Sequence, residues 1–386
     1  MDDLSVIIIG AGIGGLTAGI ALCRAGYRVE IYDRVSELRP IGAGISLWSN
    51  GVKVLNSLGL ARQMAEIGGL MERMQYLSDK GKLLNDIDLQ PLVLQVGQRP
   101  YPVARADLQQ MLLEAFPGQV HLKAQCIGVE QTGDNATVLF ADGRSVSADL
   151  IVGADGIRST VREYVLGEAI APRYAGYVNV NGLVAANPDL ADVSTWVIYV
   201  GEHKRASMMP VGSDRFYFFF DLPLPEEAQP HPDGIRAELE ATFGGWCQPV
   251  QNLIAAIEPA QTNRLPIRDV GPLERFARDR IVLLGDAAHT TTPDLGQGGC
   301  QAMEDAIVLA RCLQTTTISV IDALKRYEAE RVPRTGKLVL RARQRTDDIH
   351  GKDPVVTQKW YEQLASEPPE AVTGAIAKVI LGGPLH

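Results

Sequence analysis

An apolar run that leads straight into closely spaced glycines is the feature that most restricts how this sequence can fold. Residues 4–9 read Leu-Ser-Val-Ile-Ile-Ile, a β-branched pattern typical of a strand buried on both faces. Glycines with GxGxxG spacing follow at once, at Gly10, Gly12 and Gly15. Helical apolar spacing then extends over 16–25, and a second apolar strand pattern comes next. The N-terminal part of the chain therefore predicts a strand–helix–strand unit.

Each glycine of this loop has its own physical role. The first permits a tight turn, the second lets the backbone approach a pyrophosphate, and the third lets the helix pack close to the strand. Gly14 belongs to the same loop, and the start of the helix offers free N–H groups to phosphates. Asp33 lies 18 residues after Gly15, where its carboxylate can accept from both ribose hydroxyls of an adenosine and repels a 2′-phosphate. The loop predicts a site for NAD or FAD, not for NADP.

Charge, cysteine usage and hydropathy exclude several classes of protein. The 386 residues correspond to roughly two or three domains of ordinary size. The net charge of −9 argues against nucleic acid as a partner, because phosphate binding needs a basic surface. No apolar run approaches the roughly 18 residues of a membrane span. Five cysteines without paired spacing favour a reducing, cytoplasmic location, and no zinc-ligand spacing is present, so we expect no metal. The oligomeric state is left open.

The rest of the chain alternates between helical and strand-rich segments. One strand pattern follows another over 172–222, whereas 298–313 and 319–348 have helical spacing. We expect an α/β fold with a Rossmann-like nucleotide-binding domain that is split in sequence, a β-sheet substrate-binding domain and a C-terminal helical segment. The expected boundaries are 1–70, 100–170 and 276–320 for the first domain, 71–99 and 171–275 for the second, and 321–386 for the helical segment.

Two further acidic turns end apolar strands. They are Gly153-Ala154-Asp155-Gly156 and Gly285-Asp286, and ligands of doubly wound sheets lie beyond such strand ends. Asp286 can bind a sugar-like hydroxyl chain, whereas Asp155 can touch the ligand or fix neighbouring backbone N–H groups. The segment 293–300 then opens a helix, whose N–H groups can face an anionic ring edge. These turns predict a ligand that extends beyond one mononucleotide half of a dinucleotide.

In this order, the motifs resemble the FAD-dependent aromatic hydroxylases, the group A flavoprotein monooxygenases. The likeness includes the GxGxxG loop with its acid, an arginine at position 105, and the two acidic turns. It implies bound FAD in an extended conformation, with contacts at Gly10, Gly12, Gly14, Gly15, Asp33, Arg34, Ser46, Arg105, the backbone of Cys126, Asp155, Asp286, Gly296, Gln297, Gly298, Gly299 and Cys300.

The resemblance is sharper to the urate-hydroxylating members of that family. It rests on segments 43–51, 173–179, 205–210, 215–221 and 290–294, and on Gly383-Pro384-Leu385. It implies that Asn179, Arg205 and Tyr217 line the substrate site, with Arg205 and Tyr217 as catalytic residues. A guanidinium can bind a planar anion such as urate with two N–H donors, and it can stabilise negative charge that develops on the ring during the reaction.

The resemblance also implies a reaction. NADH would dock transiently as reductant, O₂ would be the cosubstrate, and urate would be hydroxylated at C5 to 5-hydroxyisourate; NADPH stays open as the reductant. The first alternative is hydroxylation of another anionic aromatic, such as a hydroxynicotinate or salicylate. A FAD-free NAD dehydrogenase and a non-catalytic nucleotide-binding regulator are further alternatives.

Two groups of polar residues are interpreted as structural. His289 is expected to pack beside the second acidic turn without a catalytic role. A basic series near the C-terminus is expected to form a solvated helical face. Its members are Arg331, Arg334, Lys337, Arg341, Arg343 and Arg345.

Overall fold

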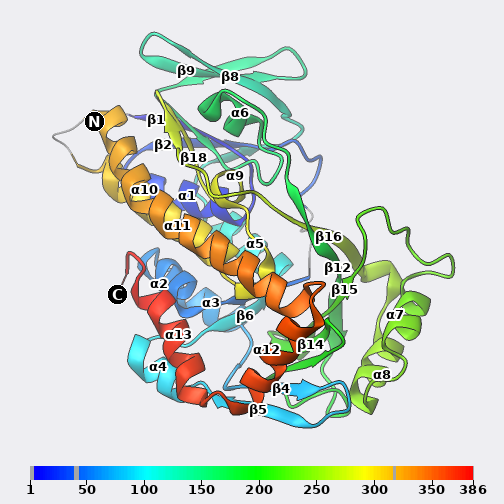
Figure 1. The fold of residues 1–386 in the computed structure, drawn as a ribbon. Helices are drawn as coiled ribbons and strands as arrows, with labels where there is room; N and C mark the ends of the chain where they lie inside the picture. The colour runs from blue at the N-terminus through cyan, green and yellow to red at the C-terminus, as the bar shows by residue number, and fades with distance from the viewer. Residues whose placement is uncertain (1–3, 39–42, 316–318, 386) are drawn as a thin grey trace.

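Two sheets, joined by a long helix, organise the computed structural model, which describes residues 4–38, 43–315 and 319–385. Figure 1 shows the first sheet in the upper half of the view, the second in the lower half, and helix α11 crossing diagonally between them. The predicted α/β class is confirmed. In the described part of the chain, no helix combines the length and apolar character that crossing a bilayer requires.

The first sheet has six strands in the order β17-β18-β11-β1-β2-β7. Their bounds are Ala277–Arg278, Ile281–Leu283, Leu150–Gly153, Ser5–Ile9, Arg28–Tyr32 and Gln119–His121. All pairings except that of β17 with β18 are parallel. Helix α1 (Ile13–Arg24) follows β1 directly and packs against α10 (Gly298–Leu313). The carboxyl ends of β1, β11 and β18 therefore share one edge, with a glycine-containing turn after each.

The second sheet has seven strands in the order β16-β12-β15-β14-β13-β4-β5. Their bounds are Asn263–Asp269, Arg173–Ala185, Arg215–Pro223, Lys204–Val211, Thr195–Gly201, Arg73–Ser78 and Leu83–Asp88. On β15, Phe216, Phe218 and Phe220 are fully buried in a cluster with residues of α7 (Ile235–Phe243) and α8 (Gln248–Ala256). Because side chains alternate along a strand, Tyr217 faces the opposite side, as the sequence predicts.

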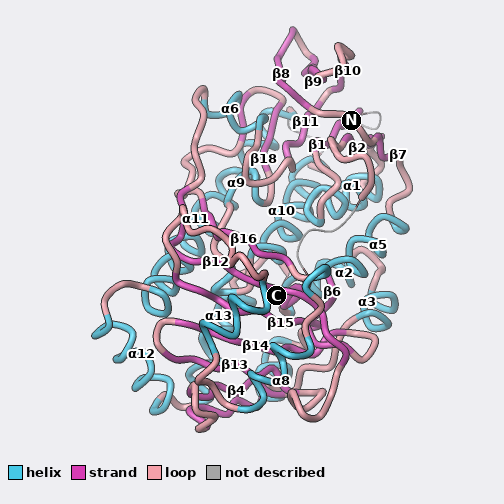
Figure 2. Tube along the Cα trace, turned by 90° about the vertical axis from the view of Figure 1, so that its right-hand side faces the viewer, coloured by secondary structure: helices cyan, strands magenta, loops and turns pink. Residues whose placement is uncertain are grey.

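Smaller elements fill the space around the two sheets. Strands β8 (Cys126–Thr132), β9 (Asn135–Phe140) and β10 (Ser145–Ala148) form a separate sheet that projects at one end of the molecule in both views (Figures 1 and 2). Strands β3 (Gly44–Leu47) and β6 (Tyr101–Ala104) pair with each other; β3 contacts α10, and β6 contacts β14. This short ribbon therefore connects the surroundings of the first sheet with the second sheet. The remaining elements before residue 300 are α2 (Ser49–Ser57), α3 (Ala61–Ile67), α4 (Gln90–Val96), α5 (Arg105–Ala115), α6 (Thr160–Leu166), η1 (Pro259–Gln261), α9 (Asp286–His289) and η2 (Pro293–Leu295).

The C-terminal segment consists of α11 (Val320–His350), α12 (Pro354–Ser366) and α13 (Pro369–Leu381), which confirms the helices predicted there. The interpretation of the basic series on α11 as a solvated face is wrong for several members. Arg331 is fully buried and donates to Asp305 from Nε at 2.6 Å and to Glu304 from Nη1 at 2.8 Å. Arg334 also bonds Glu304, and Arg343 donates to a different buried carboxylate. Helix α11 thus presents these cations to acids of neighbouring elements.

Asp305 connects this ion cluster to the turn after β18. Its Oδ2 accepts from the Gly285 N–H at 2.8 Å and lies 2.6 Å from His289 Nε2. Burial raises the pKa of Asp305, but the interactions with His289 and Arg331 outweigh it and lower the pKa to about 2. A depressed carboxyl pKa stabilises the fold above its ordinary value of about 4, and this contribution is lost as the pH falls toward 2.

We predict that Arg331→Met destabilises the protein by about 3–5 kcal/mol, because it removes a buried cation that contacts both Glu304 and Asp305. The matched control is Arg311→Met, since Arg311 pairs with Glu330 at a largely exposed site. That substitution should cost at most about 1 kcal/mol. Urea unfolding of the two variants measures both values, and similar costs would contradict the central role of the buried pair.

We also predict that Gly15→Ala destabilises the protein by about 1–3 kcal/mol, because the added Cβ would overlap the Gly10 carbonyl oxygen. Gly374→Ala is the control, since Gly374 lies in α13 and a Cβ there meets no atom within 4 Å. Alanine favours helix, so this variant should keep or slightly raise the midpoint of thermal unfolding. Equal midpoints for both variants would refute the packing role of Gly15.

Candidate active site

The glycine loop after β1 divides into residues that pack and one that faces open space. Gly10 has φ of +111°, and a Cβ there would overlap the Ala154 carbonyl group. A Cβ at Gly14 would crowd Leu284. At Gly12, in contrast, a Cβ would meet no atom within 4 Å. Gly12 is also the N-cap of α1, which has no side-chain cap and no acid in its first turn. The helix start is therefore open to an anionic ligand.

Asp33 lies at the end of β2 and holds this loop in place. Its Oδ2 accepts from the Ala11 N–H at 2.7 Å, and its Oδ1 accepts from the Val35 N–H at 3.0 Å. A carboxylate has about four acceptor positions, so it can accept ligand hydroxyls as well. The neighbouring Arg34 is exposed.

The two acidic turns have different environments. Asp155 accepts from the Ser159 hydroxyl at 2.5 Å and from the Thr160 N–H at 2.8 Å, and burial raises its pKa. It therefore organises the start of α6, the second of the two roles expected for it, and its contact with a cofactor stays a prediction. Asp286 is exposed although Gly285 and Ala287 beside it are buried. Its position suits a carboxylate that receives ligand hydroxyl groups.

The segment leading into α10 packs tightly against β3 and α2. Gly296 has φ of +61°, and a Cβ there would crowd Ser46 Oγ. Gln297 accepts from Asn50 Nδ2 at 3.0 Å, and α10 begins without a side-chain cap at Gly298. Gly299 and Cys300 continue the helix, and burial raises the pKa of the Cys300 thiol to about 12. The thiol is therefore neutral, and the open helix start is the group available to a ligand.

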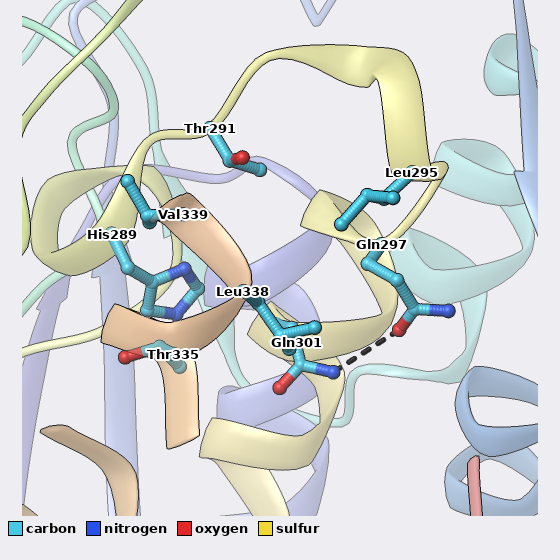
Figure 3. A pocket seen from close by; sticks show the side chains of 8 residues that line it. All are labelled: His289, Thr291, Leu295, Gln297, Gln301, Thr335, Leu338 and Val339. Atoms are coloured by element: carbon cyan, nitrogen blue, oxygen red, sulfur yellow. Dashed lines mark hydrogen bonds between the residues drawn. The ribbon is translucent and has the colours of Figure 1, made fainter. Parts of the chain in front are cut away.

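A small cavity of about 10 Å³ lies behind this segment, which is about the space of one water molecule. Figure 3 shows the side chains around it, including the hydrogen bond from Gln301 to Gln297. They are His289, Thr291, Leu295, Gln297, Gln301, Thr335, Leu338 and Val339. Since Thr335, Leu338 and Val339 belong to α11, the segment rests on α11 with little free volume.

Tyr217 connects this region to the second sheet. A Cβ at Gly44 would overlap the ring of Tyr217, so the tyrosine lies directly against the backbone of β3. Burial and Asp221 raise the pKa of Tyr217, and Arg105 and Arg205 only partly oppose them. The phenol is therefore neutral. Arg105 opens α5, and Cys126 opens β8, where burial raises its pKa to about 11.

Arg205 lies between two buried carboxylates. Its Nε donates to Asp221 at 2.8 Å, and its Nη2 donates to Asp294 at 2.6 Å. Its guanidinium also lies 5.5 Å from the centre of the Phe219 ring. Burial raises the pKa of Asp221, but the charge of Arg205, together with the interactions with His350 and Asn179, outweighs it and lowers the pKa to about 2. The site therefore contains two carboxylate charges around one guanidinium.

Asn179 belongs to the same cluster. Its Nδ2 donates to Asp221 Oδ1 at 2.7 Å, so Asp221 joins two of the three residues expected at the substrate site. Asp221, Asp294 and Tyr177 also belong to this cluster, although the sequence patterns did not single them out; the Tyr177 hydroxyl donates to Asp294 at 2.9 Å. The strand register could have indicated Asp221, because it pairs directly with Arg205 across β14 and β15.

The features at the sheet edge fit an extended dinucleotide. Two helix starts without side-chain caps, open space at Gly12 and the exposed Asp286 offer sites for phosphates and hydroxyl groups. These are the binding groups that the pyrophosphate and the ribose and ribityl hydroxyls of FAD require. The residues therefore fit FAD.

Comparison with known proteins gives the same answer. A family model described as FAD binding domain matches residues 3–342. The chain is 48% identical over 387 residues to the FAD-dependent urate hydroxylase of Mycolicibacterium vanbaalenii, covering 99% of this chain and 98% of that protein. It is 46% identical to a FAD-dependent urate hydroxylase of Klebsiella pneumoniae, over 99% of this chain and 100% of that protein.

A solved structure is similar over almost the whole fold. It is that of Klebsiella pneumoniae HpxO complexed with FAD and uric acid, with a TM-score of 0.95 and 45% identity, covering 99% of this chain and 98% of that one. Because the family model spans most of the sequence and the named relatives match nearly all of it, this chain belongs to the FAD binding domain family, is a FAD-dependent monooxygenase, and stands among the relatives of the FAD-dependent urate hydroxylases.

Proposed function

We propose that this enzyme hydroxylates urate at C5 with NADH and O₂, giving 5-hydroxyisourate, NAD⁺ and water. In this reaction urate, O₂, NADH and one proton are consumed, and one oxygen atom of O₂ enters the product. The observation that carries the proposal is the buried Arg205, whose guanidinium lies over the Phe219 ring, which in turn packs beside the ring of Tyr217. The names of the relatives support urate as the substrate.

We further propose that different segments of the chain bind FAD and the substrate. Residues 1–70, 100–170 and 276–320 would hold FAD, residues 71–99 and 171–275 would provide the substrate-binding sheet, and 321–386 would support both. FAD, when bound, supplies the exchange of electrons with NADH and O₂. The contacts proposed for it are those expected from the sequence, with Gly12, Asp33, Asp286 and the start of α10 as the main groups. The free thiols of all five cysteines favour a cytoplasmic location.

Arg205 is proposed to bind the urate anion. Its Nε and Nη2 donate to Asp221 and Asp294, so Nη1 is the nitrogen that these two bonds leave for a ligand. The guanidinium charge would stabilise negative charge that grows on the substrate ring during oxygen transfer. The two carboxylates fix the plane of the guanidinium, which reduces the conformational entropy that binding would cost.

Tyr217 and Asn179 are proposed to orient the ring. The neutral Tyr217 hydroxyl can donate or accept a hydrogen bond. Asn179 offers an amide, although its Nδ2 donates to Asp221 and its Oδ1 accepts from Asn181. We therefore expect Asn179 to act mainly by positioning Asp221, and Tyr217 to contact urate directly.

We predict that urate accelerates NADH oxidation by the purified protein loaded with FAD, and that urate disappears in proportion to NADH. Salicylate and 6-hydroxynicotinate serve as parallel substrates, because both are planar aromatic anions. Absorbance of NADH and urate measures the two rates. If one of the other anions is consumed and urate is not, the substrate assignment is wrong.

We predict that Arg205→Ala lowers kcat/KM for urate by about 10²–10³, the usual cost of removing one preorganised charge-stabilising group. The flavin absorbance of the purified variant should stay unchanged. Arg73→Ala is the control, since Arg73 pairs with Asp86 at an exposed edge of the same sheet. Loss of FAD from the Arg205 variant would assign that residue to the cofactor instead.

A further inference from the structure

His350 is buried beside the Arg205 cluster, where none of the proposed steps uses it. It is the last residue of α11 and is 6% exposed. Its Nδ1 lies 2.7 Å from the carbonyl oxygen of His203. A carbonyl oxygen only accepts hydrogen bonds, so Nδ1 must carry a proton.

The other ring nitrogen faces the two carboxylates that hold Arg205. His350 Nε2 is 3.5 Å from Asp221 Oδ2 and 3.8 Å from Asp294 Oδ1. It is buried and has no hydrogen-bond partner in the described part of the chain. In a neutral ring with its proton on Nδ1, a bare lone pair would point at two negative charges. A second proton on Nε2 turns this repulsion into attraction.

A second proton on His350 balances the charges of the cluster. Asp221 and Asp294 contribute two negative charges, and Arg205 contributes one positive charge. The remaining polar groups against Asp294 are neutral donors: the Tyr177 hydroxyl at 2.9 Å and the Thr346 hydroxyl at 2.6 Å. Buried charges are costly unless compensated, so the excess negative charge favours a second cation beside the two carboxylates.

The other groups around His350 do not supply this charge. The Tyr177 ring packs against the imidazole with 4.3 Å between ring centres. The His203 ring is turned toward Thr357 Oγ1 at 2.9 Å, and the Tyr361 hydroxyl accepts from the His203 N–H at 3.1 Å. His350 is therefore the group placed to balance the cluster.

We propose that His350 is held as an imidazolium cation and is a positioning residue for Arg205. By compensating one of the two carboxylates, it leaves the positive charge of Arg205 available to an anionic ligand. The charge state follows from the contacts of the chain alone, whereas the identity of the anion rests on the proposed function. Loss of the Nε2 proton at alkaline pH gives the cluster a net negative charge, which weakens binding of the urate anion and raises KM more than it lowers kcat.

The charge state is tested on the wild-type enzyme with bound FAD and without substrate. Histidine labelled with ¹⁵N is incorporated, and the His350 signals are assigned from their loss in His350→Asn. We expect both ring nitrogens to show the shifts of a protonated imidazole at pH 7. The shifts of a neutral ring with one bare nitrogen would overturn the proposal, whatever the substrate is.

The positioning role is tested by binding. Asparagine can keep the donor to the His203 carbonyl group but cannot carry the charge, so His350→Asn should raise the urate Kd by about tenfold or more. Flavin content should stay unchanged, and the alkaline rise of KM expected for the wild type should be absent. His231→Asn is the control, since His231 lies in an outer loop and contacts Asp233.

The outcomes distinguish the charge state of His350 from its positioning role. An imidazolium signal together with a His350→Asn Kd within about twofold of wild type overturns the positioning role. If the wild type binds no urate, the proposed function fails, and the NMR result still decides the charge state of His350. If His350→Asn does not fold, His350→Gln serves for the assignment of the ¹⁵N signals and for the Kd measurement, because its amide can also donate to the His203 carbonyl group and carries no charge.

Discussion

The burial of Arg331 between Glu304 and Asp305 is the interaction on which the cofactor side of this structure depends. Asp305 receives the N–H of the turn after β18, and Glu304 receives the Asn50 amide from α2. One buried ion cluster therefore fixes the turn that presents Asp286 and the helix that begins at Gly298. A buried ion pair offers little net stability over a well-packed apolar core, but it permits few alternative arrangements once it is formed.

Helix α11 makes contacts of this kind at several points along its length. Arg331 donates to the acids of α10, Arg343 donates to Asp269 at the end of β16, and His350 faces the carboxylates around Arg205. The helix touches the elements after the first sheet and strand β12 of the second, so it sets the distance between the loops after the first sheet and the strands of the second. Pairing each cation with acids from another element makes this distance a matter of specific contacts as well as of apolar packing.

The local patterns predicted much of the fold. The GxGxxG unit, the strand-rich middle and the C-terminal helices follow from periodicity and glycine spacing, because these signals lie within short stretches of chain. The alternation around Tyr217 also followed from strand geometry. The charged clusters could not be predicted in this way. Arg331 and His350 lie on a helix with many polar residues, and only the tertiary packing decides which of these face acids such as Asp305 and Asp294. Asp155 shows the same limit, since its sequence context fits a ligand contact and a helix start equally well.

The contact between Tyr217 and the backbone at Gly44 has an evolutionary consequence. A larger residue at 44 would push the tyrosine out of place, whereas a smaller residue at 217 would leave a gap against the strand. The two positions are therefore epistatic: a change of size at one of them requires a compensating change at the other. Substitutions should be tolerated more readily at positions of the second sheet that do not touch the ribbon of β3 and β6.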